Sequence, residues 1–265
     1  MKRISKLFLA FVFVVASSSA QSTSVLSKGE WYQFSIDTTG VFKIDQAFLT
    51  KLGINTSTIN PKNIRIFGNG GNMLPQNIND FRYTDLQENA IYVEGEEDAV
   101  FNETDYVLFY GTGAHRWTVN PGLQTAYHVQ NIFDDKAYYY LSVTEGPGKR
   151  IALAPEITQA SVKDISIFDD FVFYEKETRN LFAIGTQWFG EDFSVQNSQS
   201  FSIPFENALA GSPISVSVRG ASISSLSSSM TVSVNSNPLF SIPFQRVNQG
   251  SLTLGYTSQR TASTN

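Results

Sequence analysis

The chain has 265 residues, of which 42% are hydrophobic and 16% charged, and its formal net charge is −5 at pH 7. This apolar content is too high for a disordered chain, and the length allows one large domain or two medium ones, since domains cluster around roughly 100–150 residues. The sequence contains no cysteine, which excludes disulfides, cysteine-ligated metals and a cysteine nucleophile from this stretch. The negative charge argues against nucleic acid as a partner, because phosphate binding requires a basic surface.

Residues 1–20 have the pattern of a secretory signal peptide. Basic residues from Lys2 onward precede the apolar run of residues 7–16, and the small residue Ala20 suits cleavage before Gln21. A membrane anchor is the alternative, but ten apolar residues cover only about half of a hydrocarbon core of roughly 30 Å. We therefore expect an exported protein.

Residues 21–145 are expected to form a mostly β domain with one or two short helices. Trp31–Ile36 and Val41–Ile44 alternate apolar and polar positions on either side of the turn-forming Asp37–Gly40, which predicts a β-hairpin. Further short runs of β-forming residues, separated by turn residues, predict more strands in this domain. These runs are Ile64–Gly68, Ala90–Gly95, Asp105–Gly111 and Ala137–Val143.

A short helix is expected directly after the predicted hairpin. Gln46–Leu52 carries apolar residues at helical spacing. Asp45 precedes this segment as a predicted N-cap, and Gly53 follows it as a predicted glycine C-cap.

Two polar segments of this domain are candidates for ligand binding. The glycine-rich Phe67–Pro75 follows a strand, as a phosphate loop does, but it lacks the required Gly-Lys-Ser/Thr, and Pro75 prevents a helix from starting there. We expect a wide turn with positive φ at Gly70 or Gly71. The acidic run Glu94–Asp105 offers oxygen ligands, but its spacing fits no calcium loop, so a solvated turn between two strands is expected.

The sequence singles out no catalytic constellation. His115 and His128 are its two histidines, and neither has a serine or carboxylate partner at a recognisable spacing. Structural roles are therefore expected for both. No catalytic residue, cofactor site or metal site is predicted.

Residues 146–265 are expected to form a second domain, an antiparallel β-sandwich. Beyond Gln199 the segments are rich in serine and valine and alternate polar and aliphatic positions, as strands with one buried face do. The expected strands are Phe201–Phe205, Ile214–Gly220, Met230–Ser236 and Phe240–Phe244. The sequence reaches Asn265 without a closing strand, so we expect this domain to be incomplete at its C-terminus.

The densest aromatic cluster is Gln187–Phe193. Trp188 and Phe189 are neighbours, so on a strand one ring is expected inside the sandwich and the other toward the first domain or a further domain. Gly190 allows a close backbone approach. Together with Glu191, these are the candidate domain-junction or interaction residues. A sugar-stacking surface is the alternative.

Six sequence strings follow one another along the chain: Tyr32–Asp45, Ile64–Pro75, Arg82–Asp98, Phe101–Gly113, His128–Leu141 and Gln187–Phe193. The series resembles the N-terminal, non-catalytic region of the gingipain-like cysteine-peptidase sortases of the type IX secretion system in Bacteroidetes, over roughly residues 31–205.

The resemblance implies an exported protein that is associated with the outer membrane at the cell surface. In that family the full-length protein removes the C-terminal signal domain of exported cargo and attaches the cargo to anionic lipopolysaccharide. Implied partners are a peptidase domain downstream in the same protein, the outer-membrane barrel shuttle protein, other type IX surface subunits and, through the full-length protein, the cargo signal domains. The family's catalytic Cys and His lie beyond the N-terminal region, so no catalytic residue carries over.

Two other functions stay open from the sequence. One is an exported adhesion or glycan-binding β module that uses Trp117, Trp188 and nearby tyrosines. The other is a free-standing hydrolase, for which the sequence shows no candidate pair of catalytic groups.

Overall fold

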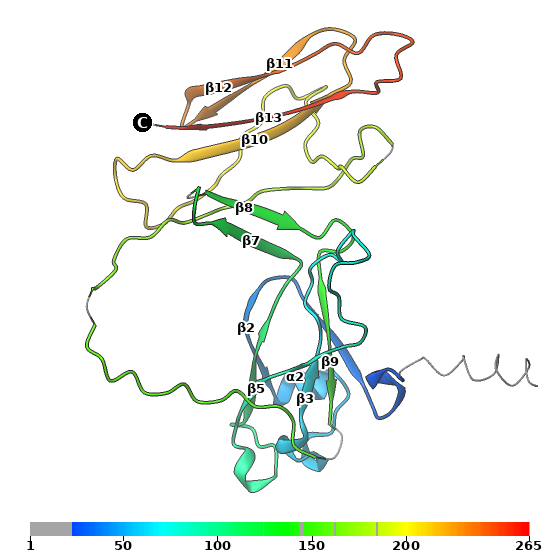
Figure 1. Cartoon of the computed structure of the whole chain (residues 1–265), viewed down its shortest axis with the longest axis vertical. Coiled ribbons are helices and arrows are strands. Elements are labelled where there is room, and N and C mark those ends of the chain that lie inside the picture. Colours follow the sequence, from blue (N-terminus) through cyan, green and yellow to red (C-terminus); the bar gives the residue numbers. More distant parts are fainter. Residues whose placement is uncertain (1–22, 124, 144–145, 162, 184, 265) are drawn as a thin grey trace, which may run out of the picture. The chain divides into compact units, whose positions relative to one another are not determined.

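The computed structural model describes residues 23–123, 125–143, 146–161, 163–183 and 185–264 (Figure 1). These residues form several small antiparallel sheets, one short helix and 3-10 turns, which confirms the mostly β fold predicted from the sequence. No helix within these ranges is long and apolar enough to cross a membrane. The predicted signal peptide lies outside the described residues.

The chain divides into two compact units, residues 1–158 and residues 159–265, which we call the N-terminal and C-terminal units. The domain boundary predicted at residues 145 and 146 stays a prediction.

The core of the N-terminal unit lies between two antiparallel sheets. One sheet has the strand order β1-β9-β3-β4, and the other has the order β2-β6-β5. A separate β7-β8 hairpin completes the described strands of this unit (Figure 1). The strands are β1 (Tyr32–Ile36), β2 (Gly40–Asp45), β3 (Arg65–Phe67), β4 (Glu88–Asn89), β5 (Ile91–Glu94), β6 (Tyr106–Gly111), β7 (His115–Asn120), β8 (Thr125–Gln130) and β9 (Ala137–Ser142).

The predicted hairpin of β1 and β2 is wrong, although both strands exist. β1 pairs with β9, where Phe34 lies opposite Tyr139, and β2 pairs with β6, where Phe42 lies opposite Phe109. Both strands are apolar on one face. Placing them in two facing sheets covers the core from both sides, which an isolated two-stranded hairpin cannot do.

The predicted helix is confirmed as α2 (Gln46–Lys51). The side chain of Asp45 accepts a hydrogen bond from the backbone N–H of Phe48 at 2.9 Å, and Gly53 ends the segment with φ of +91°. Leu49 anchors the helix in the core, since it is fully buried. The 3-10 turns are Val25–Ser27, Thr56–Thr58, Pro61–Asn63 and Glu96–Asp98.

Tyr139 occupies the centre of the N-terminal core. Its ring stacks on Phe34 and meets Phe109 edge-on, with centroid distances of 6.0 and 5.3 Å. Its hydroxyl accepts a hydrogen bond from the N–H of Thr112 at 2.7 Å and donates to the carbonyl of the same residue at 3.2 Å. Burial raises the pKa of Tyr139, so the hydroxyl keeps the proton that it donates. At Gly68 an added Cβ would lie 2.4 Å from the tyrosine ring, so this position requires glycine.

Residues 146–151 continue the N-terminal unit. Ile91 exchanges backbone hydrogen bonds with the residues on both sides of Arg150. The Arg150 guanidinium forms an ion pair with Glu96 at 2.8 Å and donates to three backbone carbonyls within Pro61–Ile64. One half-buried arginine side chain therefore ties this segment to two loops of the unit.

The C-terminal unit contains two small antiparallel sheets, β10-β13 and β11-β12, with a shared core. Their strands are β10 (Ser215–Ser222), β11 (Ser228–Val234), β12 (Asn237–Phe244) and β13 (Tyr256–Ser263). Phe240, Ile242 and Phe244 form the buried centre of this core. The expectation of inward aliphatic and outward serine side chains is confirmed for β10, where the valines are half-buried and the serines between them exposed.

Two strand predictions in this unit are wrong. Phe201–Phe205 forms no strand; its side chains are exposed or half-exposed, and Pro204 lacks the N–H that a ladder needs. The segment without a predicted strand, Tyr256–Ser263, is β13 and pairs with β10 along its whole length. Its polar residues suit an exposed strand with little inward apolar surface, which is why the pattern gave no strand signal.

We predict that Tyr139→Phe lowers the free energy of unfolding by about 1–3 kcal/mol, because the buried N–H of Thr112 loses its acceptor while the ring packing is unchanged. Urea unfolding followed by circular dichroism measures the change. The control Tyr110→Phe removes a hydroxyl from a side chain that is 60% exposed and should change stability by less than about 0.5 kcal/mol. Equal stabilities of Tyr139→Phe and the parent would show that the hydroxyl does not hold the Thr112 backbone.

Candidate functional site

The candidate residues Trp188–Glu191 lie in an irregular part of the C-terminal unit. An isolated antiparallel bridge joins Phe189 to Arg179, with two backbone N···O distances of 2.8 and 2.9 Å. The side chain of Arg179 also forms an ion pair with Asp192 at 2.9 Å. Local cross-links therefore hold this segment, which is not part of a named sheet.

Gly190 and Glu191 fit closely against Lys176. An added Cβ at Gly190 would lie 3.0 Å from both the Cβ and the carbonyl oxygen of Lys176, so the close approach expected here is present. The Glu191 carboxylate accepts a hydrogen bond from the Tyr174 hydroxyl and lies 3.3 Å from the Lys176 ammonium. The Tyr174 hydrogen bond is the main cause of a lowered pKa of Glu191, to which Lys176 adds.

The two neighbouring aromatic rings differ in their surroundings. Phe189 is half-buried; Phe182 meets it edge-on with centroids 6.2 Å apart, and the Arg219 guanidinium lies 5.9 Å from its centroid. Trp188 is 39% exposed. Phe189, Gly190 and Glu191 thus make contacts within the C-terminal unit, while Trp188 presents part of its ring to solvent. The domain-junction role of these residues stays a prediction.

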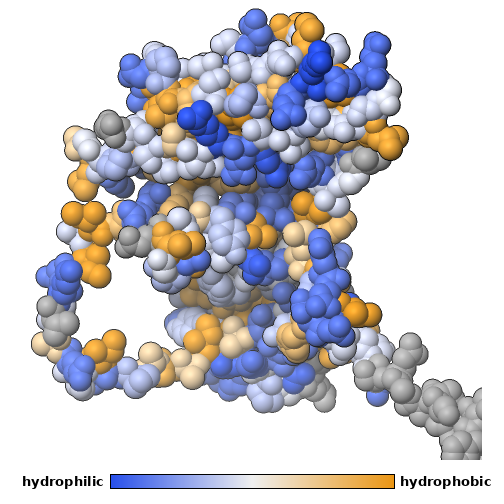
Figure 2. Space-filling model, turned by 45° about the horizontal axis from the view of Figure 1, so that its top comes forward, coloured by the Kyte–Doolittle hydropathy of each residue, from blue (hydrophilic) through white to orange (hydrophobic). Residues whose placement is uncertain are grey.

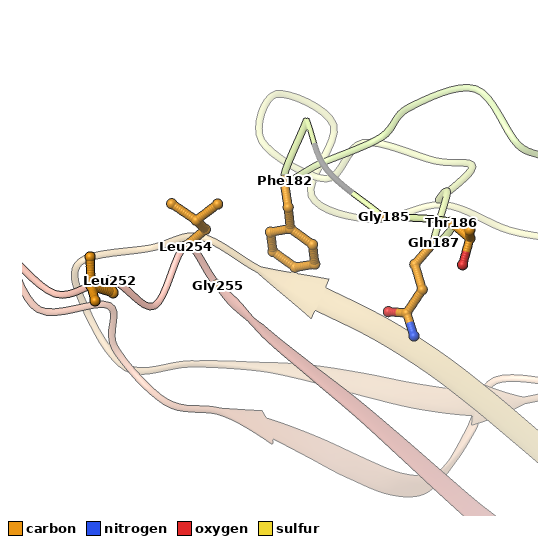
Figure 3. Close-up of a pocket in the computed structure, with 7 residues that line it drawn as sticks. All are labelled: Phe182, Gly185, Thr186, Gln187, Leu252, Leu254 and Gly255. Atoms are coloured by element: carbon orange, nitrogen blue, oxygen red, sulfur yellow. The ribbon is translucent and has the colours of Figure 1, made fainter.

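An open hollow of about 450 Å³ adjoins this segment (Figure 3). Phe182 and Gln187 extend from the irregular segment toward the strands, and Leu252, Leu254 and Gly255 come from the loop before β13. At Gly255 an added Cβ would collide with the Phe182 ring. The described lining residues carry apolar, hydroxyl and amide groups and no titratable side chain, so this hollow suits contact with a surface better than acid–base chemistry.

The structure brings His115 and His128 together, which sequence spacing alone did not show. They lie on adjacent strands of the β7-β8 hairpin with their rings stacked at 5.3 Å, and Trp117 meets His128 edge-on at 5.2 Å. Burial lowers the pKa of His128 to about 4, and the neighbouring His115 contributes by repulsion. The signal that could have revealed the pair is the alternating pattern on both sides of Pro121-Gly122.

The glycine-rich and acidic segments are turns, as expected. Gly70 adopts φ of +79°, and an added Cβ at Gly71 would lie 2.6 Å from the backbone nitrogen of Ala114. The wide turn thus packs against the loop after β6. The acidic run contains a 3-10 turn, Glu96–Asp98, in which Glu97 and Asp98 are exposed and Glu96 is half-buried. Among the described residues no cluster of three or more histidines and carboxylates is arranged to hold a metal ion.

Exposed apolar side chains recur along residues 151–161 and 163–173, which have no regular secondary structure. Leu153 is 98% exposed, and Ile157, Ile165 and Phe168 are each more than three-quarters exposed. Figure 2 shows hydrophobic residues at the surface among hydrophilic ones. Leu153 and Ile157 belong to the N-terminal unit and Ile165 and Phe168 to the C-terminal unit, so each unit exposes apolar side chains in this stretch.

We predict that acidification from pH 7 to pH 5 weakens the β7-β8 hairpin. The pKa of His128 is about 4 in the folded chain, against about 6.5 when unfolded, so between these values the unfolded chain binds more protons and stability falls with falling pH. Histidine NMR titration should give the low pKa, and the protection factors of the hairpin amides, which are corrected for the pH dependence of intrinsic exchange, should fall from pH 7 to pH 5. His128→Asn should remove that pH dependence. Equal protection factors in the parent at both pH values would show that folding does not favour the neutral form of His128.

Comparison with known proteins gives a match of fold. No protein-family model and no curated protein matches the chain. A solved structure, dimeric latent PorU from Porphyromonas gingivalis, matches with a TM-score of 0.61 and 20% sequence identity over 91% of this chain. The match covers 22% of the PorU chain, so this sequence spans less than a quarter of that protein. It confirms the resemblance drawn from the sequence strings, as a likeness of fold to one part of PorU.

Proposed function

We propose that this chain is the non-catalytic N-terminal region of a type IX secretion system sortase. The full-length form would remove the C-terminal signal domain of exported cargo and attach the cargo to anionic lipopolysaccharide at the cell surface. The observation that carries the proposal is the likeness of 91% of the chain to a limited part of PorU. The ordered sequence strings and the predicted signal peptide support it independently.

The role proposed for this region is a scaffold for a peptidase domain in the same protein. The sequence lacks the cysteine whose thiolate a gingipain-like acyl transfer requires. Each unit carries exposed apolar side chains that such a domain would cover: Leu153 and Ile157 in the N-terminal unit, and Ile165 and Phe168 in the C-terminal unit. The barrel shuttle, the other surface subunits and the cargo signal domains are proposed partners of the full-length protein.

We predict that deleting the codons for residues 23–264 in the native host, with the rest of the gene kept in frame, abolishes cargo maturation. Cargo should accumulate with its C-terminal signal domain attached, as mass spectrometry of surface fractions would show. Purified residues 21–265 should cleave no cargo signal domain and take up no thiol-directed inhibitor. Normal cargo processing in the deletion strain, or cleavage by the purified chain well above the buffer rate, would refute the proposal.

A second candidate function, glycan binding, is favoured by the exposure of two tryptophans, Trp188 at 39% and Trp117 at 40%. Exposed tryptophan rings can stack on sugars. If the chain is a scaffold, Trp188→Ala should leave lipopolysaccharide binding in a pull-down assay unchanged. A variant that melts like the parent but loses at least about tenfold in binding would favour the glycan-binding module. Phe189→Ala is the matched control, because its half-buried ring offers less surface to a sugar.

A further inference from the structure

A groove opens in the N-terminal unit between β1 and β2, where the sequence predicted a hairpin. It has a volume of about 310 Å³, at the lower end of the range for ligand sites of roughly 300–1,000 Å³. Phe34, Phe42, Phe48 and Phe109 form its apolar lining. The groove lies within one compact unit and does not include the candidate residues discussed above.

Both borders of the groove are edge strands. Among the described strands, β1 hydrogen-bonds only to β9, and β2 hydrogen-bonds only to β6. Each strand therefore leaves one row of backbone N–H and C=O groups without a strand partner. Such an edge is a template on which an extended peptide can add a strand.

The aromatic lining is packed but not fully covered. Phe34 meets Phe48 and Phe109 edge-on at 5.7 and 5.6 Å, and Phe42 stacks on Phe109 at 5.5 Å. Phe109 is 1% exposed, whereas the other three rings are half-buried. An apolar side chain that entered the groove would bury the remaining exposed faces of these three rings, which is favourable in proportion to the area removed from water.

The charged residues of the groove favour an acidic occupant. Lys43 and Lys136 line it together with a single aspartate, Asp37. Neither lysine belongs to an ion pair within the described residues. The Lys43 ammonium lies 4.5 Å from the Tyr106 ring centroid, a contact that leaves its charge uncompensated by a carboxylate.

We propose that this groove binds an extended peptide strand with a central aromatic side chain and flanking carboxylates. The backbone of the strand pairs with the free edge of β1, and its aromatic side chain packs among Phe34, Phe42 and Phe48. Its carboxylates face Lys43 and Lys136. A strand meets all three features at once, because alternate side chains point to one face while the backbone remains free to pair. This proposal does not rest on the proposed function.

The test measures fluorescence anisotropy of a labelled eight-residue peptide with residues 21–265 of the chain. The peptide alternates threonine with valine, has phenylalanine at its centre and carries aspartate at both ends. We expect saturable binding with a Kd below about 1 mM. Replacing the phenylalanine by serine, or N-methylating the backbone amides that would pair with β1, should each weaken binding at least about tenfold. No binding of the parent peptide up to several times that concentration would overturn the proposal.

The matched variants are Lys43→Glu with Lys136→Glu, and Lys51→Glu as the control. Lys51 is an exposed lysine at the end of α2 that does not line the groove. The double variant should weaken binding roughly tenfold at low salt, while the control should bind like the parent, with melting temperatures unchanged in both. Equal weakening by the control would overturn the assignment of the site.

Two other occupants are outcomes that would contradict the proposal. If 3-phenylpropionate and the N-methylated peptide compete as well as the unmodified peptide, the groove is a pocket for small aromatic carboxylates. If sedimentation velocity shows a dimer that the peptide dissociates, a second copy of this chain is the occupant. A monomer that binds the unmodified peptide preferentially supports the strand.

Discussion

The fold of the N-terminal unit depends on Tyr139. Its ring lies between two sheets that share no strand, and its hydroxyl satisfies the backbone of Thr112 at the exit of β6. Gly68 lacks a side chain where the ring passes. A buried tyrosine can fix both the spacing of the sheets and the path of a loop. Its ring fills the space between the sheets, and its hydroxyl requires a hydrogen-bond partner once it is buried.

The separation of β1 and β2 follows from this arrangement. Each strand covers one side of the aromatic core, so neither is available to pair with the other. The same separation that buries Phe109 leaves the groove between the two edges, with three phenylalanine rings only half-covered. The core and the proposed binding groove thus both result from the placement of β1 and β2 in different sheets.

The C-terminal unit is held by different means. Its buried core is small, centred on Phe240, Ile242 and Phe244, and the irregular segment around Trp188–Glu191 is tied by ion pairs, one bridge and aromatic contacts. Exposed ion pairs stabilise by at most about 1 kcal/mol each, so the ion pairs of this segment contribute little to its stability.

The sequence by itself determined the mostly β class, the capped helix α2, the positions of β3, β5, β6 and β9, and the glycine turn at Gly70. These features are local, since alternation, caps and positive φ act within a few residues. Only the tertiary structure decided that β1 and β2 lie in different sheets, that β13 pairs with β10, that His115 stacks on His128 and that Glu191 meets Lys176. Some of these contacts join residues that are distant in sequence. The others depend on which of several strands with similar local patterns pair with each other, and this is decided by which pairing buries the most apolar surface.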